Sequence, residues 1–535
     1  MPGDTTGMTL EQQIGQLFMV GFDGTSASPG IIDLIQRYHV GGVIFFSRNI
    51  ASAQQVSALT RSLQGAAKAA GHRYPLLISI DQENGMVRRL GPDMTAFPGS
   101  MALGAIGSEQ ITYDVAQATG EELKAVGINM NLAPVADVNN NPANPVIGVR
   151  SFGEDPQQVA RLTAAAVRGY RAAGIITAIK HFPGHGDTAT DSHRALPVVP
   201  HSMERLSAVE LVPFKRGIEA GADTVMIAHI SLPAIMPPDG LPATVSPAVI
   251  HDLLREQLGY EGVVISDCME MDAITKTVGA EQGSILALKA GTDLVLVSHR
   301  YDRQRASIEA ALAGARSGAL PPETISQAVE RVLRLKQRLV SWDDALPAAP
   351  PAWAGSEAHQ QLAQRAYEQS TTLVRNEDAL LPLRLDPSDA LLVLLPRPTT
   401  FSQASDKAHH HKFFAEIIRQ RHNAVNILSL SPQPTEAEYQ RALQAARSAK
   451  ATIVLTMNAN LDKHQTQLMQ ALLQTDAPVI GVAVGNPYDL LAFPALRTYL
   501  ATYEYTQPAL AAAARVLFGE IQPQGRLPVS LPGLA

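Results

Sequence analysis

Charged and imidazole side chains follow six apolar runs of the sequence, and side chains of these types carry out the chemistry of many hydrolases. They include Asp81, Asp137, Lys180-His181, His229, Asp267 and Ser298-His299. An Asp directly after a strand also caps the helix that follows, so any one of these positions alone is weak evidence for a site. Their recurrence after successive apolar runs predicts one shared pocket.

The expected pocket has the side chains of a sugar-binding site. It combines several carboxylates, the Lys180-His181 pair, and two arginines in nearby loops, Arg89 and Arg150. Carboxylates and cationic groups bind hydroxyls through charge-assisted hydrogen bonds, and sugars offer many hydroxyls. Neither common Gly-rich phosphate loop occurs in the sequence. The set of residues therefore favours a carbohydrate as the substrate.

A metal-dependent hydrolase is the competing interpretation. The residues that could be drawn as zinc ligands are His181, His185, Asp187, Asp191 and His193. Glycines and a proline make this segment a loop, and it has no His-Glu-x-x-His pair on a helix. We therefore expect no metal and no cofactor, and no loss of activity with a chelator.

The candidate side chains must be positioned by a pattern that repeats through the first 340 residues. Each unit has an apolar run, a polar or Gly-rich loop, and a helical stretch such as residues 51–70, 109–127 or 156–174. The eight apolar runs are residues 17–21, 42–46, 76–80, 130–135, 176–179, 224–228, 262–266 and 294–297. Eight buried strands alternating with helices predict a (β/α)₈ TIM-like barrel, whose catalytic groups follow the carboxyl ends of its strands. A doubly wound open sheet is the alternative, and the count of eight favours the barrel.

The composition changes between the barrel and a second domain. Residues 341–362 are rich in proline and alanine and predict a linker. Five more apolar runs follow, at residues 390–395, 425–428, 452–455, 479–484 and 498–501. With the helical stretches between them, they predict a smaller α/β layered (sandwich) domain over residues 363–535, after a catalytic barrel over residues 1–340.

Size and composition indicate a globular protein. The chain has 535 residues, of which 46% are hydrophobic and 17% charged, which is enough for two domains with sizeable cores. The net charge of −7 gives no reason to expect nucleic acid as a partner. The one cysteine, Cys268, excludes an intramolecular disulfide and fits a reducing compartment. No signal-peptide pattern and no apolar run of roughly 20 residues occurs. We expect a cytoplasmic protein without a membrane span, or a secreted one if a leader was trimmed.

Several blocks resemble glycoside hydrolase family 3, in the order expected for that family. Residues 180–187, followed by Asp191-Ser192-His193, resemble the signature loop of its bacterial β-N-acetylglucosaminidases (β-hexosaminidases), and residues 262–267 resemble its nucleophile segment. Further matching blocks are residues 81–83, 133–139 and 150–156, with residues 486–489 and 525–529 typical of two-domain members. The resemblance covers nearly the whole chain.

The resemblance implies a role for each matching residue. Asp267 would be the nucleophile of a retaining glycosidase, attacking the anomeric carbon to give a covalent glycosyl-enzyme. His193 would be the general acid/base, with Asp191 as its orienting partner. The remaining residues would hold the sugar at the non-reducing end or line its pocket: Asp81, Arg89, Arg150, Lys180, His181, His229 and Met271.

Histidine is an unusual proton donor for a glycosidase, but an ordinary imidazole titrates near neutral pH and suits the task. A neighbouring Asp fixes the tautomer of the ring and stabilises its cation. Side chains two residues apart in an extended segment lie on the same side of the backbone. We therefore expect Asp191 and His193 to be in contact.

One block departs from the family. Where Gly-Gly-Arg is common after Asp-Gln-Glu, this sequence has Asn84, Gly85 and Met86. The change leaves open whether a local ion pair forms and whether Asn84 alters the rim of the sugar site.

The resemblance implies an exo-acting enzyme that removes terminal β-linked N-acetylglucosamine from muropeptides or chitin oligosaccharides by double displacement. Phosphorolysis is one alternative, because a neutral imidazole repels an incoming phosphate less than a carboxylate does. A family 3 β-glucosidase or β-xylosidase is another. A carbohydrate-binding scaffold without catalysis is disfavoured because Asp191, His193 and Asp267 are all present.

Overall fold

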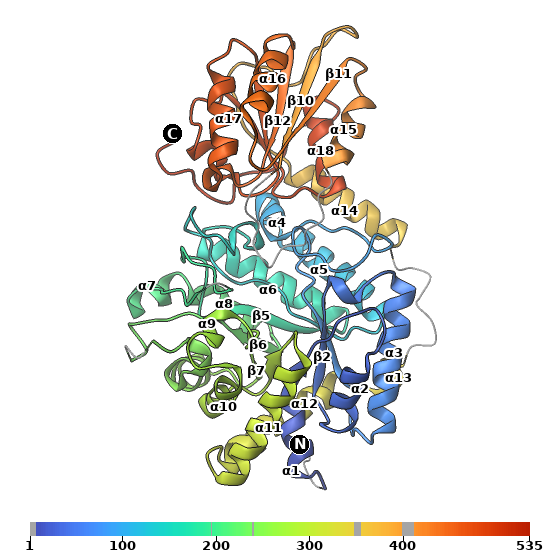
Figure 1. The fold of residues 1–535 in the computed structure, drawn as a ribbon, viewed down its shortest axis with the longest axis vertical. Helices are drawn as coiled ribbons and strands as arrows, with labels where there is room; N and C mark the ends of the chain where they lie inside the picture. The colour runs from blue at the N-terminus through green and yellow to red at the C-terminus, as the bar shows by residue number, and fades with distance from the viewer. Residues whose placement is uncertain (1–6, 194, 238–239, 347–354, 398–410, 535) are drawn as a thin grey trace.

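The computed structural model describes residues 7–193, 195–237, 240–346, 355–397 and 411–534. These residues form an eight-stranded sheet and a six-stranded sheet. Figure 1 shows the two parts stacked along the long axis, with the eight-stranded part running from blue to yellow-green and the six-stranded part from orange to red.

The eight-stranded sheet is a closed barrel. Its parallel strands are β1 (Phe18–Val20), β2 (Gly42–Phe45), β3 (Leu77–Ile80), β4 (Met130–Asn131), β5 (Ile176–Phe182), β6 (Thr224–Ile227), β7 (Val263–Ser266) and β8 (Val295–Val297). Neighbours pair in chain order and β8 pairs with β1. A parallel bridge between Ile265 and Leu294 joins the two remaining edges. The predicted barrel is confirmed, and the open sheet is wrong.

All residues of these eight strands are buried. A parallel sheet covered on both faces needs apolar residues at consecutive positions, which is why every strand except β5 lies within an apolar run of the sequence. The surrounding helices are α1 (Leu10–Gln16), α2 (Pro29–Gln36), α3 (Ala53–Ala69), α4 (Ser100–Ile106), α5 (Glu109–Ala125), α6 (Pro156–Ala172), α7 (Met203–Ala208), α8 (Leu211–Glu219), a π-helix (Ala248–Gln257), α9 (Asp272–Thr275), α10 (Ala280–Ala290), α11 (Tyr301–Ser317), α12 (Pro322–Leu339) and α13 (Trp342–Ala345).

Two strands differ from their predicted bounds in a way that matters for the site. Strand β5 continues to Phe182, so Lys180 and His181 lie within the strand and not after it. Strand β4 ends at Asn131, because Pro134 has no N–H to continue the ladder. The chain rejoins the sheet at a bridge between Val135 and Lys180. This bridge places Asp137 beside His181.

The second sheet has the strand order β11-β10-β12-β13-β14-β9, and β9 is its antiparallel edge. The strands are β9 (Thr372–Asn376), β10 (Leu391–Pro396), β11 (Val425–Leu430), β12 (Ala451–Thr456), β13 (Val479–Ala483) and β14 (Thr498–Ala501). Alternate residues of β10 face opposite layers. One layer contains α16 (Glu436–Arg447) and α17 (Lys463–Leu473), and the other contains α15 (His411–Arg419) and α18 (Gln507–Leu517), as Figure 1 also shows. The predicted α/β layered domain is confirmed.

The second domain packs on the loops that follow β3 and β4. Helix α14 (Glu357–Ser370), which begins inside the range assigned to the linker, contacts α4, α5 and α18. The Gly99 N–H donates to Glu504 Oε1 at 3.0 Å, and Asn139 Nδ2 donates to Tyr488 Oη at 3.0 Å. The loops that carry Arg89 and Arg150 are therefore supported from the second domain. Among the described residues, no helix combines the length and apolar character that crossing a membrane requires.

Candidate active site

A cavity of about 560 Å³ lies at the carboxyl edge of the barrel strands. All the site residues predicted from the sequence line it except Asp137, Asp191 and His229. Its lining, within the described residues, comes entirely from the barrel. Its volume is within the usual range for a small-molecule site, and its polar groups converge from separate strands.

Asp267 comes directly after β7, where the strand opens into the cavity. Its N–H donates to the Ile227 carbonyl at 3.1 Å, and its Oδ1 accepts from the Cys268 N–H at 2.6 Å. Burial raises the pKa of this carboxyl. The opposing effect is larger and lowers the pKa to about 2; it comes from the imidazoles of His229, His181 and His193 and from the Cys268 N–H. Asp267 is therefore ionised at neutral pH, as a nucleophilic carboxylate must be.

His229 lies behind the cavity wall and is fully buried. Its Nε2 donates to the Cys268 carbonyl at 2.9 Å, and its Nδ1 lies 2.6 Å from Thr244 Oγ1. Burial lowers the pKa of this imidazole and favours the neutral ring. His229 therefore positions the segment after Asp267 rather than lining the pocket itself.

Asp191 and His193 form the contact expected from their spacing. Asp191 Oδ1 accepts from His193 Nδ1 at 2.7 Å and from the His193 N–H at 2.9 Å. The Asp191 carboxyl is buried, which raises its pKa, but the bonds from His193 lower that pKa more. The ring of His193 keeps 26% of its side-chain surface exposed and lines the cavity. With Nδ1 held by the carboxylate, Nε2 is the atom left to exchange a proton.

The loop that carries this pair is tied down at Ser192. Ser192 Oγ lies 3.1 Å from His185 Nε2, and the Ser192 carbonyl accepts from the Ala273 N–H at 3.4 Å. Burial lowers the pKa of His185 to about 4, so this ring is neutral at physiological pH. Because Ala273 lies in α9, which follows Asp267, this bond ties the loop to the segment that follows Asp267.

A buried ion network also lines the cavity. Lys180 Nζ lies 2.6 Å from both Asp81 Oδ1 and Glu83 Oε1. Arg150 grips Glu83 with two bonds of 2.8 Å. Burial raises the pKa of Glu83, but Arg150 and Lys180 lower that pKa well below its usual range. Burial lowers the pKa of Lys180, but Asp81 and Glu83 raise that pKa by more. Glu83 therefore joins both cations.

Replacing Glu83 by glutamine is expected to lower the free energy of unfolding by about 3 kcal/mol, because two buried cations then share only Asp81. KM for a substrate of the cavity should also rise. Chemical denaturation and steady-state kinetics measure the two effects. The matched control is Glu109→Gln, whose carboxylate is 48% exposed beside Arg168 and should contribute less than about 1 kcal/mol. If the two variants had equal free energies of unfolding, the buried network would not stabilise the fold as expected.

His181 is oriented by a residue to which the sequence assigned no role. Its Nδ1 donates to Asp137 Oδ2 at 2.7 Å, and its Nε2 lies 3.3 Å from Arg150 Nη2. The same carboxylate accepts from the His185 N–H at 2.7 Å. Asp137 is fully buried, so it is a positioning residue. Its place after the fourth apolar run was the available signal, but the contact itself depends on the bridge between β4 and β5.

Three more lining residues form the edge of the cavity near β2 and β8. The rings of Phe46 and His299 have centroids 5.3 Å apart, and the guanidinium of Arg48 lies 4.3 Å from the Phe46 ring centre. Arg48 also donates to the Ser298 carbonyl at 2.8 Å. An aromatic face beside fixed polar groups suits the apolar side of a sugar ring.

The departure at Asn84 and Met86 does not reach the cavity lining. Asn84 has φ 68°, a conformation that Asn adopts more readily than most residues other than glycine, and its Nδ2 donates to Thr119 Oγ1. Met86 is buried in the apolar cluster of the second domain. An apolar contact between domains therefore occupies the place where family members commonly carry an arginine.

The zinc set considered from the sequence does not assemble among the described residues. Each of the three histidines has other partners. His181 contacts Asp137, and His193 contacts Asp191. His185 contacts Thr188 and Ser192. Of the five residues considered, Asp187 is the one that belongs to a group close enough to share an ion, and its companions are His201 and Glu210.

A second cavity, of about 540 Å³, lies between the loop after β3 and helices α14 and α18. It is lined by none of the residues assigned roles in catalysis or sugar binding. The residues expected to carry the chemistry therefore gather at the cavity at the strand ends.

A closed barrel with this polar cavity and an appended α/β domain defines a two-domain glycoside hydrolase. The chain belongs to glycosyl hydrolase family 3: the model of the family's N-terminal domain matches residues 9–335, and that of its C-terminal domain matches residues 371–534. The family expected from the sequence blocks is confirmed.

Relatives match along almost their whole length. Beta-hexosaminidase A of Pseudoalteromonas piscicida is 32% identical, with 98% of this chain and 97% of that protein covered. A beta-N-acetylglucosaminidase/beta-glucosidase of Cellulomonas fimi is 28% identical, with 98% and 94% covered. The solved structure of a glycoside hydrolase family 3 beta-N-acetylglucosaminidase from Paenibacillus sp. str. FPU-7 is 43% identical, with a TM-score of 0.93 over 98% of this chain and 99% of that one.

Proposed function

We propose that this glycoside hydrolase removes terminal β-linked N-acetylglucosamine from oligosaccharides or glycopeptides by a retaining double displacement. The observation that carries the proposal is the Asp191–His193 pair, whose imidazole lines the same cavity as the ionised Asp267. The sugar preference is supported by the names of the relatives, two of which are N-acetylglucosaminidases. Muropeptides and chitin fragments are the natural sources of such ends.

In the first step, a carboxylate oxygen of Asp267 attacks the anomeric carbon and the bond from that carbon to the glycosidic oxygen breaks. His193 gives its Nε2 proton to the departing oxygen, and Asp191 keeps the other ring nitrogen oriented. In the second step, neutral His193 takes a proton from water. The oxygen of that water attacks the anomeric carbon and releases Asp267.

The buried network holds the sugar during both steps. Asp81, Lys180 and Arg150 present charges to the cavity from fixed positions, and Arg89 and His181 extend the same wall. Charge-assisted bonds to sugar hydroxyls gain most from groups that do not reorganise when the substrate arrives. Met271 supplies an apolar contact on the wall next to the nucleophile.

A panel of aryl β-glycosides tests the sugar preference. We expect kcat/KM for the N-acetylglucosaminide to exceed that for the glucoside and the xyloside by at least about 100-fold, because a site built to hydrogen-bond a group rejects analogues that lack it. Initial rates at matched leaving group measure the ratio. If the glucoside were turned over equally well, the enzyme would accept glucosides as well as N-acetylglucosaminides, and the proposed sugar preference would be wrong. The family membership would not be affected.

The same assay in phosphate buffer tests the transfer to water. Free N-acetylglucosamine is expected as the product in the presence and absence of phosphate. The alternative is phosphorolysis, and a sugar 1-phosphate formed as the main product would establish it. The glucoside and xyloside reactions without phosphate are the controls for non-specific salt effects.

A further inference from the structure

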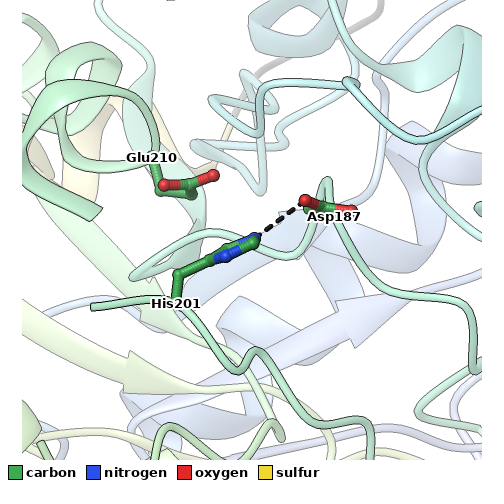
Figure 2. Close-up of side chains that lie close together, drawn as sticks. All are labelled: Asp187, His201 and Glu210. Carbon is green, nitrogen blue, oxygen red and sulfur yellow. Dashed lines mark hydrogen bonds and ion pairs between the residues drawn. The ribbon is translucent and has the colours of Figure 1, made fainter. Parts of the chain in front are cut away.

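Three side chains outside the cavity converge from separate segments of the chain. Asp187 lies in the loop after β5, His201 precedes α7, and Glu210 directly precedes α8. Figure 2 shows the three side chains pointing toward one another. His201 Nε2 and Asp187 Oδ2 are 2.8 Å apart, and one nitrogen or oxygen from each of the three residues lies within 4.8 Å of the others.

Glu210, a member of this cluster, has a buried side-chain oxygen without a hydrogen-bond partner among the described residues. Its side chain is 1% exposed, and its Oε1 accepts from Arg205 Nη2 at 3.3 Å. Within the part of the chain that the structure describes, no hydrogen-bond partner reaches Oε2 of Glu210. Buried carboxylate oxygens are seldom left without a donor or a cation, because the loss of their hydration is otherwise uncompensated.

We propose that Asp187, His201 and Glu210 bind a divalent transition-metal ion of the zinc type. One imidazole and two carboxylates are a ligand set that zinc accepts, whereas calcium and magnesium prefer oxygen alone. Two carboxylates balance the two charges of the ion. The tautomer of His201 with its proton on Nδ1 leaves the Nε2 lone pair for the metal. Arg205, 40% exposed, remains with Glu210 Oε1 at the edge of the site.

The ion would position the catalytic loop and take no part in the reaction. None of the three ligands lines the cavity. Asp187 lies four residues before Asp191 and His201 lies eight residues after His193. An ion bound by Asp187, His201 and Glu210 would link both ends of the segment that carries the acid/base to the start of α8. This link would limit the conformations of the segment. This site goes beyond the proposed function and does not depend on which sugar the cavity accepts.

Metal binding to the full chain tests the site directly. The protein is stripped with a chelator, dialysed into metal-free buffer and titrated calorimetrically with zinc chloride. We expect saturable binding of one equivalent per chain, weaker binding of magnesium and calcium, and a rise in Tm of at least about 2 °C with zinc. No saturable zinc binding, or no change in Tm at saturation, would overturn the proposal.

Substitutions locate the ion. Glu210→Gln and His201→Gln should each weaken zinc binding at least about tenfold. Before zinc is added, Glu210→Gln should unfold at a Tm no lower than that of the stripped parent, because its amide oxygen can still accept from Arg205 and its NH2 replaces the oxygen that lacks a donor. Unchanged zinc affinity in the Glu210 variant overturns the proposal, as does a lower Tm of that variant in the stripped state.

Two further variants separate this site from other places where zinc could bind. His251→Gln changes the exposed group formed by His251, Asp252 and Glu256 and should leave the affinity unchanged. Asp191→Asn should also leave it unchanged. Loss of zinc binding in either variant, with binding kept in Glu210→Gln, would place the ion at the exposed group or at the catalytic pair and overturn the assignment.

Discussion

Replacing Asp267 by alanine is expected to lower kcat for an aryl β-N-acetylglucosaminide by at least about 10⁴-fold, because the covalent step loses its nucleophile. Asp267 is suited to this role by its position after β7 and by a pKa lowered to about 2, which leaves it ionised at every pH above about 3. Loss of activity on acidification from about pH 6 to about pH 4, just below the ordinary pKa of histidine, would therefore not be caused by protonation of Asp267.

The measurement is a comparison of kcat in matched preparations whose folding is checked by circular dichroism. Asp302→Ala serves as the control, because that carboxylate is 60% exposed on α11 and should change kcat less than about twofold. A fluorinated slow substrate should leave a sugar adduct on the peptide that contains Asp267 in the parent protein. Near-normal activity of Asp267→Ala would show that Asp267 is not the nucleophile. An adduct on another carboxylate would identify that residue as the nucleophile instead.

Replacing His193 by alanine is expected to produce a loss that depends on the leaving group. For a phenyl glycoside, whose oxygen needs a proton to depart, kcat/KM should fall about 10²- to 10⁴-fold. For a dinitrophenyl glycoside, which departs as an anion, kcat/KM should fall far less. Asp191→Asn should show the same pattern more weakly, because the amide keeps a partner for the ring but removes the charge that stabilises the imidazolium.

Steady-state kinetics with both substrates, with and without added azide, separate a catalytic role from structural damage. A small anion can attack the glycosyl-enzyme without a general base, so azide should restore turnover of the dinitrophenyl substrate in His193→Ala and yield a glycosyl azide. His251→Ala is the control, since that ring is 59% exposed. Equal losses with both leaving groups would contradict proton transfer by His193.

The barrel was predictable because its strands need consecutive apolar residues, and each apolar run of the first domain marks the position of one of them. Strand β9 was not predicted. It is an antiparallel edge whose residues after Thr372 are only half-buried, so it has no continuous apolar run. The end of β5 was also missed, since Lys180 and His181 are polar residues inside a strand, and only the buried ions around them make that placement stable.

The sequence by itself was enough to predict the contact between Asp191 and His193, because residues two apart in the chain can meet through local backbone geometry alone. Here that geometry is a turn in which Asp191 Oδ1 accepts from both the backbone N–H and Nδ1 of His193. It also determined that Asp267 follows a buried strand. Only the tertiary structure decided which ions meet, since Glu83 reaches Lys180 and Arg150 across three different strands or loops. The same holds for Asp187, His201 and Glu210, which lie up to 23 residues apart in the connection between β5 and α8 and meet only through its folded path. Contacts within a few residues follow from local backbone geometry, whereas contacts between distant residues form only when packing of the whole barrel has fixed the relative positions of its strands and helices.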